Sequence, residues 1–338
     1  MAKKKVRIGQ TIALIPEAGS AIRPEWLLDG QSGNTNFPYS KYKALATVGE
    51  VDAKTKLGLT GYPDGQAAWL LDDNTVRVAY QSESYANVTG TRTPEPETYP
   101  RELKTGVTFT GSRIHTIDYA RDAFADFMGN DSAASDMVKG SGFLFNRAFN
   151  LFGKEVTPKN TDPADLAAKW GNQTLPSGEI VEFGTPLSDA DFFFHSFCGA
   201  WYEPANRYGE GQGFSDDIWL MAEEWDIGED NFAPGVAGEA VANETMGLAA
   251  MAVDVANEVA YSVPALGQTG YEKIAPLNTG ESDYVVVVTA GYNHGQDPAP
   301  LKIYVGRKGY DAEGNEITED HSERDQFLGR NGMLWGQL

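Results

Sequence analysis

Residues 67–80 read AAWLLDDNTVRVAY, and this stretch decides the fold class. Two runs rich in β-branched and aromatic residues, 67–71 and 75–80, flank the turn-forming Asp72-Asp73-Asn74. Such side chains are enriched in strands, whereas Asp and Asn favour tight turns because their short polar groups bond to the nearby backbone. The stretch therefore predicts a β-hairpin.

Similar short runs recur along the chain, each bounded by Gly, Pro, Asn or Asp; they are residues 113–117, 180–183, 218–222, 284–289 and 302–305. Helix is sparse, and the clearest candidate is 162–170, where Asp162 and Pro163 are typical of a helix start. We expect an all-β fold, a β-propeller-like arrangement of short antiparallel strands with long loop insertions and few short helices.

No linker divides the chain, so we expect one propeller-like domain over residues 67–338. An N-terminal segment, 1–66, is expected to pack on the propeller or to start it. A loop-rich insertion is expected near 88–178, since residues 88–106 interleave three prolines with glutamates and predict a surface loop. Residues 247–255 are rich in Ala and Met, but the alternation that continues through Val259 and Tyr261 favours strand.

The charge balance limits the partners. With 27 Lys and Arg against 48 Asp and Glu, the net charge is −21, which argues against nucleic acid because phosphate backbones are bound through clustered cations. The same excess suits a salty exterior or a site that concentrates cations. No apolar run approaches the ~18–20 residues of a membrane span. An extracellular or periplasmic location is expected although no cleavable signal peptide is visible, and a cytoplasmic location stays open.

Acidic residues follow several predicted strands, and the chain has a single cysteine, which excludes an internal disulfide and a cysteine-rich zinc module. The candidate metal ligands are Glu83, Cys198, Glu223, Glu224 and Glu272. If these strand ends converge, the carboxylates form an oxygen-rich site for calcium, and a thiolate suits a softer metal such as iron. Each residue alone has a simpler interpretation, because an acid at a strand end is typically solvated and a lone cysteine is typically a small buried apolar residue.

The order of these elements resembles a known family. The matching segments are 75–83, ending in Gln81-Ser82-Glu83; Cys198-Gly199; the strand that ends in Glu223-Glu224; Ala265-Leu266-Gly267-Gln268 leading to Tyr271-Glu272; and residues 301–306. This order is similar to that of the PhoX-type alkaline phosphatases, calcium- and iron-dependent phosphomonoesterases built on a β-propeller. The resemblance spans residues 67–338, and it implies that this chain is a diverged member of the family, either truncated or with fewer blades.

The resemblance implies roles for the matched residues. Cys198 would be a thiolate ligand to iron, while Glu83, Glu223 or Glu224, and Glu272 would be carboxylate ligands to iron or calcium. The metals would polarise the phosphoryl group of a small phosphorylated substrate.

A second function stays open, because Ser82 and Tyr271 stand where the family has histidines, and Gln268 where it has an arginine. In this alternative the chain is a non-catalytic calcium-binding β-propeller that acts as an extracellular surface, adhesive or assembly protein and associates with itself. The acidic surface and the 7 Trp, 15 Tyr and 16 Phe residues suit this alternative.

Overall fold

The computed structural model of the chain describes residues 7–10, 43–83, 101–109, 112–130, 132–150, 153–158, 173–174, 180–181, 197–223, 249–268, 270–291 and 301–338. Within these residues strands dominate, and the helices are α1 (Phe124–Gly129), α4 (Glu323–Arg330) and the short 3₁₀ turns η3 (Arg121–Ala123) and η4 (Ala134–Asp136). The expected all-β class with few short helices is therefore confirmed.

Twelve of the strands form three antiparallel meanders, in each of which the strands pair in chain order. Meander 1 contains β1 (Tyr62–Asp72), β2 (Thr75–Glu83), β5 (Arg113–Ala120) and β6 (Val138–Phe143). Meander 2 contains β10 (Phe197–Glu203), β11 (Ile218–Glu223), β12 (Ala249–Asp254) and β13 (Val259–Gln268). Meander 3 contains β14 (Tyr271–Leu277), β15 (Tyr284–Gly291), β16 (Leu301–Arg307) and β17 (Gly336–Gln337).

The remaining strands are short: β3 (Arg101–Glu102), β4 (Thr108–Phe109), β7 (Arg147–Phe149), β8 (Gln173–Thr174) and β9 (Ile180–Val181). Strand β7 pairs in parallel with β13, and β10 touches β14 through one parallel pair, Gly199 with Lys273. The β10–β14 pair joins meanders 2 and 3, and β7 adds an edge strand, so that the sheet is curled and nine-stranded.

The meanders pack face to face. One apolar cluster lies between meanders 1 and 2 and includes Ala79, Phe197 and Trp219. A second fills the other side of meander 2 against meander 3 and α4, and includes Leu220, Val287 and Phe327. A third covers the outer side of meander 1 with α1 and residues from the N-terminal region. Each sheet buries its apolar faces against its neighbours, and this stacking of small antiparallel sheets is the propeller-like arrangement predicted from the sequence.

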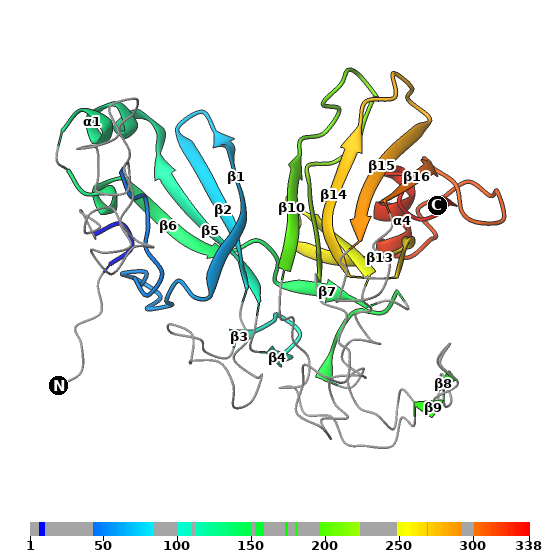
Figure 1. Ribbon diagram of the computed structural model, residues 1–338, viewed down its shortest axis with the longest axis horizontal. Coiled ribbons are helices and arrows are strands. Elements are labelled where there is room, and N and C mark those ends of the chain that lie inside the picture. The colour runs from blue at the N-terminus through cyan, green and yellow to red at the C-terminus, as the bar shows by residue number, and fades with distance from the viewer. Residues whose placement is uncertain are drawn as a thin grey trace.

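The first strands of the meanders, β1, β10 and β14, lie innermost. Figure 1 shows β1 and β10 facing each other where meander 1 meets meander 2, with β14 beside β10. This contact between first strands brings together segments more than 60 residues apart in sequence, and it positions the candidate site.

The predicted strands that fall on described residues are present, and residues 72–74 form the turn between β1 and β2. Residues 249–254 are strand β12, as favoured. The expectation of a surface loop up to residue 106 is wrong at its end, because Leu103 is buried in the cluster between meanders 1 and 2, and Arg101 is buried where its guanidinium donates to Phe145 O. The helix predicted over 162–170 lies outside the described residues.

Candidate functional site

Each innermost strand is interrupted near its start by a β-bulge. The extra residues are Asp64-Gly65 in β1, Gly199-Ala200 in β10 and Glu272 in β14. A bulge breaks the regular in-and-out alternation of side chains and re-aims the residues beside it. Because the three bulges lie at the same end of three strands in contact, they direct Asp64, Cys198 and Glu272 towards one place.

Two glycines allow the strands to approach so closely. A Cβ on Gly65 would lie 2.2 Å from the Ala200 Cβ, which is far inside van der Waals contact. Gly199 has φ +70°, a conformation that favours glycine, and a Cβ there would lie 3.0 Å from the Glu272 carbonyl oxygen. Each glycine directly follows a site residue, so Asp64-Gly65 and Cys198-Gly199 combine a polar side chain with a close backbone approach.

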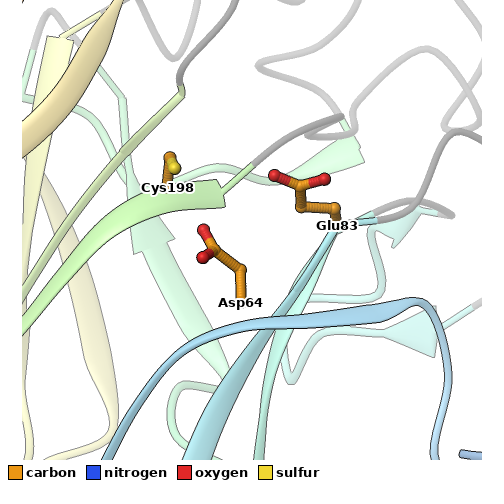
Figure 2. Close-up of side chains that lie close together, drawn as sticks. All are labelled: Asp64, Glu83 and Cys198. Carbon is orange, nitrogen blue, oxygen red and sulfur yellow. The ribbon is translucent and has the colours of Figure 1, made fainter. Parts of the chain in front are cut away.

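The result is a compact group of potential metal ligands. One carboxylate oxygen of Asp64, one of Glu83 and the Cys198 Sγ all lie within 4.8 Å of one another. Figure 2 shows the three side chains close together, Asp64 on β1, Glu83 at the end of β2 and Cys198 on β10. The Cys198 Sγ also donates a hydrogen bond to Glu272 Oε2 at 3.8 Å. Glu272 thus adds a fourth potential metal ligand, from meander 3. We call Asp64, Glu83, Cys198 and Glu272 the bulge cluster.

The structure therefore brings together three of the residues that the sequence singled out, Glu83, Cys198 and Glu272. Glu223 ends β11 beside Phe197 and is only 5% exposed, but it does not belong to the group whose ligand atoms lie within 4.8 Å. Glu224 lies outside the described residues.

Sequence reasoning missed Asp64, because it precedes the predicted strand of residues 67–71. The pattern that could have found it is the repeat of a polar residue followed by glycine at the start of an innermost strand, as in Asp64-Gly65 and Cys198-Gly199.

The donor set fits a cation. Three carboxylates and a thiol in one place repel one another when ionised, unless a positive charge neutralises them. Within the part of the chain that the structure describes, neither Asp64 nor Glu272 forms an ion pair, and Asp64 Oδ2 is buried without a hydrogen-bond partner. Carboxylate oxygens suit hard cations such as calcium, and the thiol suits a softer metal such as iron. Both metals that the resemblance implies are thus compatible with these atoms.

Comparison with known proteins adds no assignment, since no family model, no curated protein and no solved structure matches the chain. In the residues that the structure describes, no helix is both long and apolar enough to span a membrane.

Proposed function

We propose that the chain is a metal-dependent phosphoester hydrolase whose cation is held at the bulge cluster, acting on small phosphorylated substrates outside the cytoplasm. The observation that carries the proposal is the convergence of Asp64, Glu83 and Cys198 within 4.8 Å. Residues separated by up to 134 positions in sequence meet where the bulges of β1 and β10 and the end of β2 come together. The order of elements shared with the PhoX-type phosphatases supports phosphate chemistry in particular.

Each residue of the bulge cluster would have a defined role as a metal ligand. Cys198 would bind iron through its thiolate, while Asp64, Glu83 and Glu272 would bind iron or calcium through carboxylate oxygens. The bound metal would supply Lewis-acid stabilisation of the charge that develops on the phosphoryl oxygens. The chain's own part is to hold four donors on rigid strands, so that little reorganisation accompanies binding of the cation or of the substrate.

Electrostatics makes the cation necessary for a phosphate substrate. A chain of net charge −21 repels phosphate at long range, and the bulge cluster adds further negative charge where the substrate would bind. Only a local positive charge can reverse this field, so binding of phosphate and binding of cation should be coupled.

The test is hydrolysis of p-nitrophenyl phosphate by the purified protein with calcium and iron, and again after chelation. We expect activity that chelation abolishes and that Asp64→Asn and Cys198→Ser both lose. Glu281→Gln, which removes an exposed acid between β14 and β15, is the matched control and should keep full activity. Full activity in chelator, or unchanged metal content in Asp64→Asn and Cys198→Ser, would contradict the proposal.

One observation favours the alternative, a non-catalytic assembly protein. Register places nine apolar residues and the two cations Lys273 and Arg307, but no acid, on the outer face of strands β14–β16. On this face Leu301 is 75% and Ile303 57% exposed. An acid-free apolar face is where two chains of net charge −21 could meet without bringing carboxylates together, so the partner we propose for it is a second copy of the chain.

Light scattering after size-exclusion chromatography tests this alternative. We expect a dimer that Ile303→Glu converts to monomer, whereas the control Leu70→Glu, at a 52% exposed position on β1, leaves the dimer intact. A wild-type protein that is monomeric at every concentration would exclude it.

A further inference from the structure

A buried amide lies directly across β1–β2 from Asp64. Gln81 is the single residue of β2 opposite the Asp64-Gly65 bulge, and it is fully buried. Its side chain leaves the same face of β2 as that of Glu83, two residues further on, because alternate residues of a strand share a face. The same face of the bulge meets β10, as the contact between Gly65 and Ala200 shows. Gln81 therefore projects towards the side of the sheet that carries the bulge cluster.

Trp219 fixes the orientation of this amide. The Trp219 indole Nε1 donates to Gln81 Oε1 at 2.8 Å, between two fully buried side chains. An indole nitrogen can only donate, so the amide oxygen must face Trp219 and the amide nitrogen must point the other way. Gln81 Nε2 consequently presents two N–H donors, and among the described residues it has no hydrogen-bond partner.

The atom that complements this donor is Asp64 Oδ2, a buried acceptor that also lacks a partner. A buried donor and a buried acceptor left unsatisfied on facing residues each carry a desolvation cost, and both costs disappear if the two groups pair. Carboxylates that bind metals are commonly held by a hydrogen bond to their second oxygen, which orients the first oxygen towards the metal.

We propose that Gln81 is the positioning residue of the metal site: held by Trp219, it donates from Nε2 to Asp64 Oδ2 when a cation occupies the bulge cluster. In the cation-bound state this contact would occupy Oδ2 and leave Oδ1 for the cation. This inference rests on the proposed function for the presence of the cation, but it does not depend on which reaction follows.

Calorimetric titration of the metal-free protein with Ca²⁺ tests the inference. Gln81→Met keeps the shape of the side chain and removes the donor, so the dissociation constant should rise by about tenfold or more, as for other outer-shell partners of metal ligands. Trp219→Phe should raise it in the same direction, because the amide is then free to turn. The matched control is Thr289→Val, which removes a fully buried and unpartnered hydroxyl from β15 and should leave the affinity unchanged.

A double-mutant cycle separates positioning from a general loss of stability. If Gln81 acts through Asp64, then Gln81→Met should have no further effect on the residual affinity of Asp64→Asn. Equal affinity of the wild type and Gln81→Met would overturn the inference and leave the proposed function standing. If the wild type binds no Ca²⁺ and Co²⁺ gives no thiolate charge-transfer band, both the inference about Gln81 and the proposed function are overturned. Thermal unfolding of each variant shows whether it is folded, and Trp219→Phe carries the test if Gln81→Met is not.

Discussion

The closest backbone approach in the candidate site offers the sharpest test of the architecture. Gly65→Ala adds one methyl group whose carbon would lie 2.2 Å from the Ala200 Cβ, 3.1 Å from Ala200 N and 3.2 Å from its Cα. The first distance cannot be sustained, so β1 and β10 must move apart. Overpacking of this kind typically costs about 1–3 kcal/mol. Because Asp64 directly precedes Gly65, the same movement separates it from Cys198 and should weaken cation binding.

Urea unfolding followed by tryptophan fluorescence gives the change in stability, and calorimetry gives the change in cation affinity. Gly140→Ala in β6 is the matched control, because a Cβ at that position meets nothing within 4 Å; its stability should change by no more than about 1 kcal/mol. In the double variant Gly65→Ala/Ala200→Gly the 2.2 Å contact is gone and only the two longer contacts remain. We therefore expect partial recovery, with a coupling energy of about 0.5–3 kcal/mol.

A Gly65→Ala variant that is as stable as the wild type and binds cations equally well would show that the innermost strands are not in contact as described. If Ala200→Gly gives no recovery in the double variant, the destabilisation arises from something other than the contact between these two residues.

Burial lowers the pKa of His115 well below its usual value, and the positive charges of two neighbouring arginines lower it further. The unfolded chain thus binds a proton near pH 6.5 that the folded chain does not, so stability should fall as the pH drops below about 6.5, and His115→Gln should flatten that slope in denaturant titrations. Arg147 bridges Glu155 and Glu323, and its hydrogen bond to Glu323 lowers the pKa of that carboxyl. Arg147→Met should cost about 1 kcal/mol or less above pH 5, and this difference should shrink as Glu323 is protonated and at high salt. Saturating cation should raise the free energy of unfolding by about 2.7 kcal/mol at 100 times the dissociation constant, and Asp64→Asn should lose this gain; a melting temperature indifferent to chelator would contradict it.

Much of the fold followed from local pattern. The hairpin at 67–80 and the later strands were predictable because β-branched runs between turn residues dominate those segments. Strand β6 was not predictable, since VKGSGF contains two glycines and resembles a loop; it is a strand because β5 offers it an open edge to pair with. Leu103 was likewise placed on the surface, because a local pattern does not reveal which sheet lies beneath a loop.

The candidate site was predictable only where residue type and chain order were enough. Cys198 was predicted to be a metal ligand because it is the sole cysteine, and Glu83 and Glu272 because they are acids beside predicted strands. Asp64 did not, because its side chain reaches the cluster through a bulge, and a bulge shifts the register that sequence alternation assumes. Gln81 could not be recognised either, since its importance arises from facing that bulge and from its bond to Trp219.

The arrangement of donors has a consequence for the whole molecule. Asp64 and Glu83 belong to meander 1, Cys198 to meander 2 and Glu272 to meander 3, so a cation held by all four would cross-link the three meanders at their innermost strands. In the absence of a cation the same groups repel one another when ionised, and the repulsion acts on the contacts between β1, β10 and β14. Cation binding should therefore protect the amides of these three strands together from hydrogen exchange, although their ligands are far apart in sequence. Protection confined to one meander would mean that the cation is bound within that meander alone.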